Sequence, residues 1–249
     1  DFTPGSVERV RLEAKLTEIA STPTEIANVI GGEHRRSTGP TTNVVQPHNH
    51  SAVLGTFTPA GADDIEDAIN AAVAAGPAWR SLSFDDRAAV FLRAADLLAG
   101  PWRETLAAAT MLGQSKTAYQ AEIDSPCELV DFWRFNVHFA RQILTDQPSS
   151  SPGVWNRVEG FVNAITPFNF TAIAGNLPTA PALMGNTVVW KPSETQAVAA
   201  YWTMRLLEAA GLPPGVINLV NGRGPEVSRQ ALADRRLAGI HFTGSTATF

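Results

Sequence analysis

The sequence predicts an open α/β fold, in which a parallel sheet carries helices packed against it. Four short apolar runs in the second half of the chain have the length and composition of strands buried in the middle of such a sheet. These runs are residues 161–165, 187–190, 216–220 and 237–242. Helical patterns separate them, and a mostly helical first half precedes them. In a sheet of this kind, ligands bind at the carboxyl ends of the strands.

The composition is that of a globular protein with a small-molecule partner. The chain has 249 residues, 44% of them hydrophobic, with 19 basic and 24 acidic side chains and a formal net charge of −5. This apolar content is enough for a core. Without a run of Lys or Arg, the chain lacks the electrostatic surface that binds nucleic acids or anionic membranes. The single cysteine, Cys127, excludes a disulfide framework and a multi-cysteine metal site, and it suits a reducing compartment.

Residues 1–60 are expected to form an N-terminal arm with short hairpins. Strand-like runs in this arm are interrupted by turn signals at Gly31-Gly32, Thr38-Gly39-Pro40 and Pro47-His48-Asn49. The last turn contains the pair His48 and His50. A metal needs three or four ligands, so we interpret these as loop histidines and predict no metal site.

Residues 61–145 should be mostly helical, beginning with a helix that starts at a capping box. Asp63 is followed three residues later by Glu66, and apolar residues then recur at the spacing of one helix face. Gly76 and Pro77 are expected to stop this helix.

The next helix is expected to start after Ser83, whose hydroxyl can cap it, and to end at Gly100. Further helical periodicity covers roughly residues 115–144. A turn-rich segment with an exposed strand at residues 154–158 is then expected within residues 146–159.

Residues 160–249 are expected to form a βαβαβ core. The stretch 160–190 has no charged side chain and has the length of a membrane helix. Its prolines and asparagines would leave polar groups unsatisfied in lipid, so we predict a strand, a loop, a short helix and a second strand. The next helix is expected over residues 193–210, with a second capping box formed by Ser193 and Gln196.

The loop after the first predicted strand places a side-chain amide at the expected ligand edge. Asn169 lies there between two aromatic residues, Phe168 and Phe170. An amide in this place could donate a hydrogen bond to an oxyanion that develops during a reaction. The alternative is an asparagine that only forms a turn, which is a common role of this residue.

The second predicted strand ends in Trp190-Lys191-Pro192-Ser193-Glu194. Lys191 and Glu194 could bind the vicinal hydroxyls of a ribose through charge-assisted hydrogen bonds. The alternative is a helix start with solvated charges, because acidic residues are favoured in a first helical turn in any case.

Glycines follow the third and fourth predicted strands, where helices are expected to begin. Small residues in these places let backbone N–H groups approach a phosphate. After the third strand, Gly222-x-Gly224 departs from the ordinary dinucleotide fingerprint, because Val227 takes the place of the third glycine. Gly244-Ser245 follows the fourth strand.

The remaining candidates for nucleophilic chemistry favour structural roles. Cys127 has no His, Lys or metal-ligand partner at a suggestive spacing, so we interpret it as a small buried hydrophobic residue. Ser115 lies near glycines but outside the pattern of a nucleophile elbow.

Four motifs occur in order along the second half of the chain: Thr166-Pro-Phe-Asn169-Phe, Val189-Trp-Lys191-Pro-Ser-Glu194, Gly224-Pro225 and Phe242-Thr-Gly244-Ser245. Together they resemble the aldehyde dehydrogenase superfamily. Within it, the chain is most similar to the subfamily of proline degradation that oxidises L-glutamate γ-semialdehyde, formed from Δ1-pyrroline-5-carboxylate, to L-glutamate. The runs that suggest this subfamily are residues 120–124, 132–136, 159–177 and 180–186.

The resemblance assigns roles to the residues that match these motifs. Asn169 would be the oxyanion-hole amide, and Phe170 would be an aromatic wall of the aldehyde tunnel. Lys191 and Glu194 would lie at the adenosine ribose, and Ser193 would also belong to the cofactor site. The other cofactor-binding positions would be Thr166, Pro167 and Phe168 in the cleft, Gly224, and Gly244, Ser245, Thr246, Ala247 and Thr248 at the pyrophosphate. The implied cofactor is NAD, because a carboxylate at the ribose accepts its hydroxyls and repels a 2′-phosphate.

The resemblance also implies an aldehyde-dehydrogenase-type NAD-binding domain with an atypical Rossmann sheet, truncated before the catalytic domain. Residues 61–145 and 160–249 would form this domain, and residues 146–159 would carry a strand that bridges subunits of a homo-oligomer. The nucleophilic cysteine and general-base glutamate of the superfamily lie beyond the glycine–serine turn, and Cys127 does not match the nucleophile. This segment alone is therefore expected to be inactive. The enzyme is expected in the cytoplasm, or in the mitochondrial matrix of a eukaryote.

Three alternatives remain at this point. The chain could belong to another aldehyde dehydrogenase subfamily, or it could be a nucleotide-binding module without catalysis. A structural role in forming an oligomer is the third.

Overall fold

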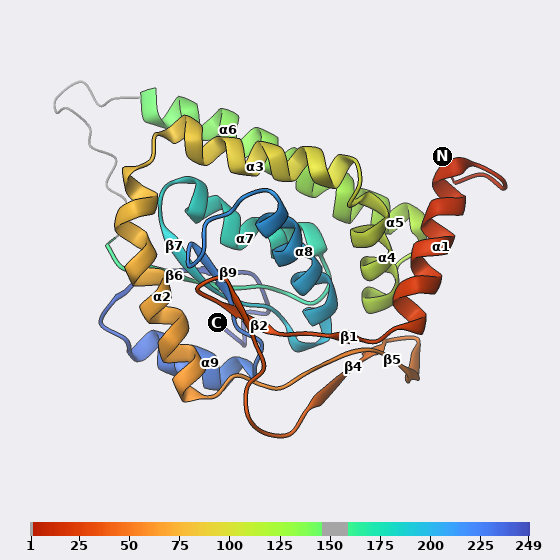
Figure 1. Cartoon of the computed structure of the whole chain (residues 1–249), viewed down its shortest axis with the longest axis horizontal. Coiled ribbons are helices and arrows are strands. Elements are labelled where there is room, and N and C mark those ends of the chain that lie inside the picture. The colour runs from red at the N-terminus through yellow and green to blue at the C-terminus, as the bar shows by residue number, and fades with distance from the viewer. Residues whose placement is uncertain (1, 146–158) are drawn as a thin grey trace.

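The computed structural model describes residues 2–145 and 159–249, and apart from its first helix its elements follow the predicted order (Figure 1). The helices are α1 (Val7–Ser21), α2 (Ala62–Ser81), α3 (Phe84–Ala99), α4 (Arg103–Gln114), α5 (Ala118–Glu122), α6 (Glu128–Thr145), α7 (Thr171–Leu183), α8 (Ala197–Ala209) and α9 (Gly224–Ala233), with a π-helical turn at Ile123–Cys127 and a 3₁₀ turn at Glu194–Gln196. The strands are β1 (Thr24–Glu25), β2 (Asn28–Ile30), β3 (Glu33–Arg35), β4 (Thr42–Gln46), β5 (Asn49–Phe57), β6 (Phe161–Ile165), β7 (Thr187–Lys191), β8 (Ile217–Leu219) and β9 (Leu237–Phe242). The exposed strand predicted at residues 154–158 lies outside the described residues.

A six-stranded sheet with the order β3-β2-β8-β7-β6-β9 forms the centre of the molecule. Strands β6 to β9 run parallel, as predicted, and the β2–β3 hairpin adds two antiparallel strands beside β8. The chain moves from β6 to β7 and β8 on one side, and then returns to place β9 on the other side of β6. This reversal between β6 and β9 is the position at which open α/β sheets bind ligands.

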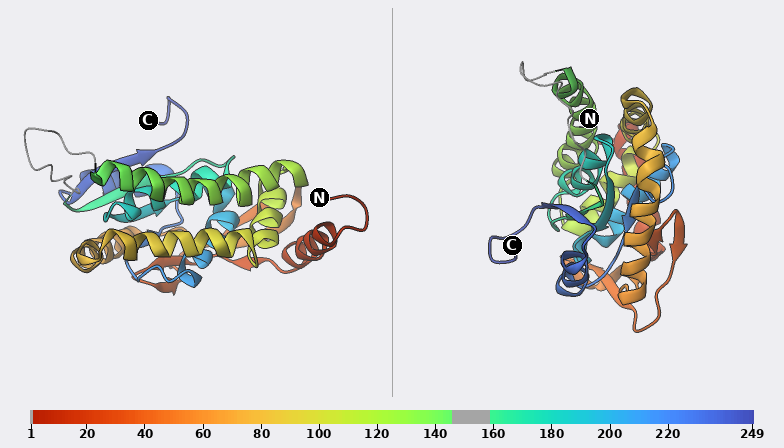
Figure 2. Two further views of the ribbon diagram at one scale, coloured as in Figure 1. Left: turned by 90° about the horizontal axis from the view of Figure 1, so that it is seen from above. Right: turned by 90° about the vertical axis from the view of Figure 1, so that its left-hand side faces the viewer.

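Helices cover both faces of this sheet (Figures 1 and 2). On one face, α3, α4, α6, α7 and α8 enclose the larger core, which includes Val162, Val188 and Trp190 of the sheet. On the other face, α2 and α9 cover Phe161 and Val189. Successive side chains of a strand point to opposite faces. Both faces of β6 and β7 are therefore buried, which explains the continuous apolar runs that predicted them.

The N-terminal arm contributes to two sheets. The predicted turn at Gly31-Gly32 connects β2 and β3, and both glycines have positive φ angles of 60° and 83°. The predicted turn at residues 47–49 connects β4 and β5, which form a second sheet with β1. Helix α1 was not predicted, because it buries only Leu12 and Ile19 and so has little apolar periodicity.

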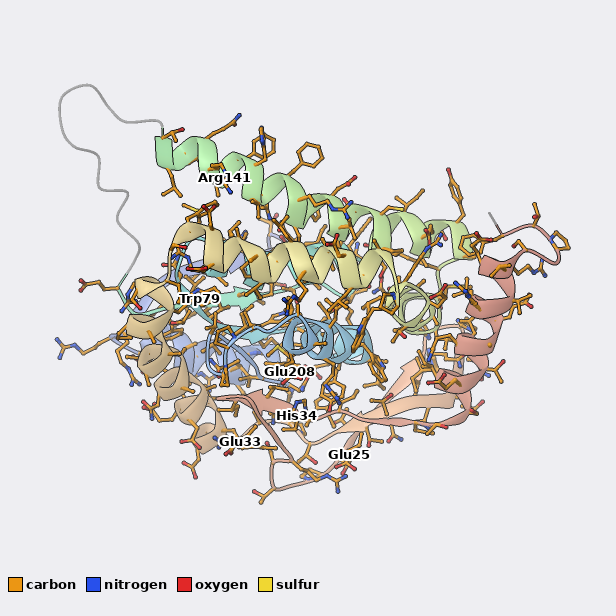
Figure 3. All side chains as sticks on the ribbon, turned by 45° about the horizontal axis from the view of Figure 1, so that its top comes forward. Glu25, Glu33, His34, Trp79, Arg141 and Glu208 are labelled. Carbon is orange, nitrogen blue, oxygen red and sulfur yellow. The ribbon has the colours of Figure 1, made fainter. Side chains whose placement is uncertain are left out.

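The β2–β3 hairpin is anchored to α8 by His34 (Figure 3). The ring Nδ1 of His34 lies 3.0 Å from the hydroxyl of Tyr201, and its Nε2 lies 2.9 Å from the carboxylate of Glu208. The hairpin is thus held by side-chain contacts as well as by its pairing with β8.

Helix α2 corrects the prediction that Gly76 and Pro77 would stop it, because it continues to Ser81. Pro77 lies inside the helix, where it removes one backbone hydrogen bond. The last turn is held by Trp79, which is 2% exposed and donates from its indole Nε1 to the carbonyl oxygen of Ala182 at 2.8 Å (Figure 3). Burial of this tryptophan outweighs the helix-breaking preference.

Two predicted capping boxes are wrong. Helix α2 begins after Gly61, whose N–H donates to the carboxylate of Asp64 at 2.9 Å, so the cap lies two residues before Asp63. The side chain of Ser193 makes no cap hydrogen bond, and Gln196 is buried. The chain there enters a 3₁₀ turn before α8, which starts later than predicted.

The other predicted helices are confirmed. The hydroxyl of Ser83 accepts a hydrogen bond from the N–H of Asp86 at 3.1 Å, as a cap of α3 does. The predicted helical region 115–144 contains α5, the π-helical turn and α6. Pro126 lies in that turn and has no N–H to offer an α-helical hydrogen bond, which is consistent with the wider turn.

The uncharged stretch forms β6, α7 and β7, as predicted. Within residues 2–145 and 159–249, no helix has the length and apolar character needed to cross a bilayer.

Candidate functional site

Thr166 ties the carboxyl end of β6 to that of β7. Its buried hydroxyl oxygen accepts a hydrogen bond from the indole Nε1 of Trp190 at 3.0 Å. Its backbone N–H donates to the carbonyl oxygen of Lys191 at 3.1 Å, and its carbonyl oxygen accepts from the N–H of Ser193 at 3.1 Å. Three residues predicted to bind the cofactor, Thr166, Lys191 and Ser193, therefore lie in one hydrogen-bonded unit.

The loop that follows β6 exposes Asn169 between two aromatic side chains. Phe168 is 62% exposed and Phe170 is 37% exposed, whereas Pro167 is half-buried. The side-chain amide of Asn169 has no hydrogen-bond partner within the described part of the chain. It is therefore available to donate to a ligand at this edge of the sheet.

Helix α7 starts directly after this loop, and a carboxylate from another segment binds its first N–H groups. Asp124, in the π-helical turn, accepts from the N–H of Thr171 at 3.0 Å and from the N–H of Ala172 at 3.1 Å. Asp124 is only 2% exposed, and the ammonium of Lys116 lies 2.7 Å from its Oδ2. The sequence does not reveal this contact, because spacing along the chain carries no sign of a cap that comes from a distant helical turn.

The ring of Phe170 and the carboxyl of Glu128 interact with the ion pair of Asp124 and Lys116. The Nζ of Lys116 lies 4.0 Å from the ring centroid of Phe170, which is a cation–π contact. Partial burial, and secondly the negative charge of Asp124, raise the pKa of the Glu128 carboxyl, while Lys116 acts in the opposite direction.

Lys191, at the end of β7, is a largely buried lysine. It is 7% exposed, and burial lowers the pKa of its ammonium, which the charge of Glu194 offsets only in part. Within residues 2–145 and 159–249, its Nζ has no hydrogen-bond or ion-pair partner. A Cβ placed on Gly224, at the start of α9, would lie 3.6 Å from this Nζ. The lysine therefore faces the N-terminus of α9, and the glycine leaves the space beside it open.

The segment after β9 begins beside the end of β6. The N–H of Thr243 donates to the carbonyl oxygen of Ile165 at 3.2 Å. The carbonyl oxygen of Ser245 accepts from the N–H of Thr248 at 3.0 Å, so a turn forms here. The residues predicted to bind pyrophosphate are all exposed at this edge: Gly244, Ser245, Thr246, Ala247 and Thr248.

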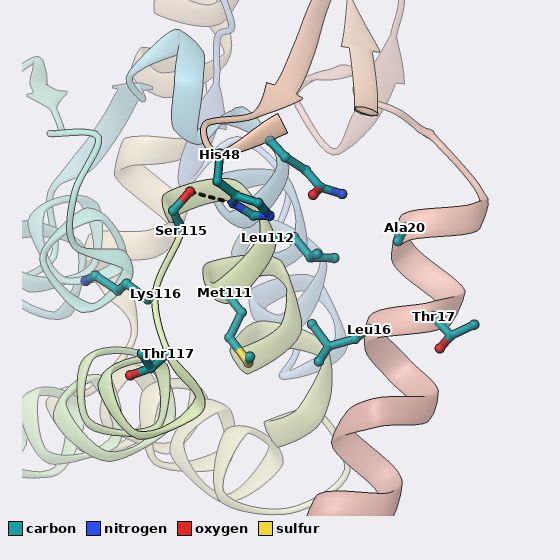
Figure 4. Close-up of a pocket in the computed structure, with 10 residues that line it drawn as sticks. Leu16, Thr17, Ala20, His48, Met111, Leu112, Ser115, Lys116 and Thr117 are labelled. Atoms are coloured by element: carbon teal, nitrogen blue, oxygen red, sulfur yellow. Dashed lines mark hydrogen bonds between the residues drawn. The ribbon is translucent and has the colours of Figure 1, made fainter. Parts of the chain in front are cut away.

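A separate cavity of about 560 Å³ lies between α1, α4 and the turn after β4 (Figure 4). His48 Nδ1 lies 2.7 Å from the hydroxyl of Ser115 at its edge. The predicted cofactor residues do not line this cavity, whose lining residues are Leu16, Thr17, Ala20, Gln46, His48, Met111, Leu112, Ser115, Lys116 and Thr117. In the described ranges, no group of three His, Cys, Asp or Glu side chains could hold a metal ion.

Cys127 differs from its prediction, because it is exposed and not buried. It lies at the end of the π-helical turn, with its Sγ 3.8 Å from a carboxylate oxygen of Glu122. Desolvation, and secondly the charge of Glu122, raise the pKa of the thiol. A raised pKa disfavours the thiolate, which is the nucleophilic form.

An open, mostly parallel α/β sheet with polar side chains at its switch point places the protein in the class of α/β folds that bind ligands, often nucleotides, at that point, and comparison with known proteins identifies the family. Residues 34–249 match the model of the aldehyde dehydrogenase family, so the chain belongs to this family.

Particular relatives are Δ1-pyrroline-5-carboxylate dehydrogenases. The crystal structure of the Mycobacterium tuberculosis enzyme bound with NAD matches the whole chain at 66% identity and a TM-score of 0.96, over 47% of that protein. The Agaricus bisporus enzyme is 44% identical over all of this chain and 46% of its own length, and the mitochondrial enzyme of Bos taurus is 46% identical over all of this chain and 45% of its own. The chain thus spans about half the length of these relatives.

Proposed function

We propose that this chain is the cofactor-binding half of an NAD⁺-dependent dehydrogenase that oxidises L-glutamate γ-semialdehyde, formed from Δ1-pyrroline-5-carboxylate, to L-glutamate. The observation that carries the proposal is the 66% identity along the whole chain to a Δ-pyrroline-5-carboxylate dehydrogenase bound with NAD. The exposed amide of Asn169 and the unpartnered ammonium of Lys191, at one edge of the sheet, support it.

The residues at this edge fit the dinucleotide. A buried cation without a partner is unfavourable, and ribose hydroxyls beside Lys191 would supply acceptors for its N–H groups. Glu194 would accept from the same hydroxyls and repel a 2′-phosphate, which favours NAD⁺ over NADP⁺. Gly224 keeps room for the ligand next to the ammonium. The cleft would be lined by Thr166, Pro167 and Phe168, and the pyrophosphate would lie at the turn of residues 244–248.

Asn169 would act on the aldehyde. Its amide N–H would donate to the substrate oxygen and bind it more strongly as negative charge develops there. Phe170 would form one wall of the substrate tunnel. When bound, NAD⁺ supplies the acceptor for the hydride that leaves the aldehyde carbon.

The proposal also covers the domains, the oligomer and the cellular location of the protein. Residues 61–145 and 160–249 would form the NAD-binding domain, and residues 146–159 would bridge subunits of a homo-oligomer. We place the enzyme in the mitochondrial matrix if the source is a eukaryote, which the mitochondrial Bos taurus relative supports, and in the cytoplasm otherwise.

The test is NADH formation by the whole gene product with Δ1-pyrroline-5-carboxylate and either NAD⁺ or NADP⁺. We expect NAD⁺-linked turnover of this substrate, well above that of simple aliphatic aldehydes. Turnover of aliphatic aldehydes alone would retain the family and discard the substrate. Binding of NAD⁺ without dehydrogenase activity would favour a nucleotide-binding module.

Replacing Lys191 by methionine is expected to weaken NAD⁺ binding by about 10-fold or more, because hydrogen bonds from a charged group contribute roughly 1.5–3 kcal/mol. The same change should raise the melting temperature of the cofactor-free protein at neutral pH, because it removes an unpartnered buried charge. Titration calorimetry with NAD⁺ and thermal melts measure the two effects.

The pH dependence of the melts has a definite sign. Burial lowers the pKa of the Lys191 ammonium in the folded protein below its ordinary value of 10.5. At pH values between the folded and the unfolded pKa, the unfolded chain therefore binds more protons than the folded chain. Stability of the parent protein should rise with pH through this window, and the variant should lack that rise. Lys15→Met, at an exposed ion pair with Glu18, is the control. Unchanged NAD⁺ affinity in Lys191→Met would contradict the ribose assignment.

A further inference from the structure

The start of α7 is held by an ion pair that lies outside the proposed cofactor residues. The Asp124 carboxylate accepts from two backbone N–H groups of the first turn, those of Thr171 and Ala172, and from the ammonium of Lys116. The loop that carries Asn169 ends at this turn. The ion pair therefore fixes the point from which the loop returns toward β6.

We propose that Asp124, held by Lys116, is a positioning residue that sets the place of the Asn169 amide for the oxidation of the aldehyde. The inference rests on the proposed oxyanion role of Asn169. Neither Asp124 nor Lys116 is proposed to touch the reacting atoms.

The helix start has no local cap that could replace the carboxylate. Phe170 occupies the N-cap position and makes no side-chain cap hydrogen bond. The hydroxyl of Thr171 is already bound, since its Oγ1 lies 2.7 Å from the Oγ1 of Thr110 and accepts from the Nε2 of Gln114 at 2.7 Å. Asp124 thus supplies the acceptors for the N–H groups of the first turn. Residues of α4 bind the side-chain hydroxyl of Thr171.

Both members of the ion pair act on the same loop. The carboxylate binds residues 171 and 172, and the ammonium lies 4.0 Å from the ring centroid of Phe170. Asn169 is the next residue along the chain toward β6. A displacement of about 1 Å in a reacting group can reduce a rate about 10²-fold, so small shifts of this helix start have large consequences.

The first variant is Asp124→Asn in the whole gene product. Both Thr171 N–H and Lys116 donate to Oδ2 of Asp124, and an amide that keeps one acceptor oxygen cannot serve all three donors. We expect kcat with Δ1-pyrroline-5-carboxylate to fall about 10-fold or more. The Kd for NAD⁺ should change much less than kcat, because the proposed ribose and pyrophosphate residues lie on other segments of the chain and only Phe168 is a close neighbour of the displaced Asn169.

The decisive measurement repeats the change in an Asn169→Ala background. If Asp124 acts through Asn169, Asp124→Asn should lower kcat there by less than about twofold, because residues that act as a unit are not additive. An equal loss in both backgrounds, or no loss in either, would overturn the positioning role. A parental kcat in Asn169→Ala itself would instead refute the oxyanion role of Asn169, and an absence of NAD⁺-linked turnover in the parent protein would refute the proposed function, so the failures are distinct.

Lys116→Met and a matched control guard against general unfolding. Lys116→Met removes only the cation and leaves the α7 N–H groups with their acceptor. It should lower kcat by less than Asp124→Asn does, and this loss should likewise disappear in the Asn169→Ala background. The control is Glu122→Gln, which removes the partly buried ion pair with Arg103 beside the π-helical turn without touching α7. It should change thermal stability and leave kcat unchanged. A kcat loss in Glu122→Gln equal to that in Lys116→Met would overturn the proposal.

Discussion

Asn169→Ala is expected to lower kcat of the whole gene product with Δ1-pyrroline-5-carboxylate by about 10²–10³-fold. Removal of one oxyanion donor has a cost of this size, because the donor is oriented before charge develops on the substrate oxygen. The amide is exposed and free of hydrogen bonds within the described chain, so its loss should leave the fold intact. Steady-state NADH formation at saturating substrate measures the effect.

Asn176→Ala provides the matched control for this variant. Asn176 lies on α7, the helix that follows the loop of Asn169, and its side-chain oxygen accepts from the Nδ2 of Asn136 at 2.7 Å. This change should reduce stability by about 1 kcal/mol and leave kcat within about twofold. Equal kcat values for the two variants would remove Asn169 from the reaction.

Trp79→Ala is expected to lower the free energy of unfolding by about 3–5 kcal/mol. The indole is 2% exposed and packs edge-on against Phe91 with ring centroids 6.5 Å apart, so its removal leaves a cavity between α2 and α3. The carbonyl oxygen of Ala182 would also lose one of its donors and keep the N–H of Gly185. Urea denaturation of the parent protein and the variant gives the difference directly.

Trp79→Phe separates the two contributions. Phenylalanine keeps most of the ring volume and loses the indole N–H, so the expected loss is about 1–2 kcal/mol. If Trp79→Ala were as stable as Trp79→Phe, the end of α2 would not depend on this packing. The continuation of the helix past Pro77 would then need another cause.

The strands of the parallel sheet could be predicted because burial on both faces leaves a mark in the sequence. Residues such as Val188, Val189 and Trp190 are all apolar, which a half-exposed strand would not show. The position of Asn169 was predictable for a related reason, since loops at the carboxyl ends of parallel strands meet at one edge. The roles of the predicted site residues still await the experiments above.

The features that sequence analysis missed depend on contacts between distant segments. The end of α2 is decided by the contact of Trp79 with α7, and the start of α7 is decided by Asp124. Free cysteines are commonly buried, but Cys127 is exposed because the π-helical turn directs it away from the core. Local propensity carries no information about any of these three.

The pairing of β2 with β8 has a consequence for synthesis on the ribosome. The carboxamide oxygen of Asn218 accepts from the N–H of Gly31 at 2.8 Å, across 187 residues of chain. At roughly 5–20 residues per second, the nascent hairpin waits about 10–40 s for its partner strand to be translated. During that interval the edge of β2 has unpaired N–H and C=O groups. Mutations that weaken the hairpin should therefore reduce the yield of folded protein more than its final stability.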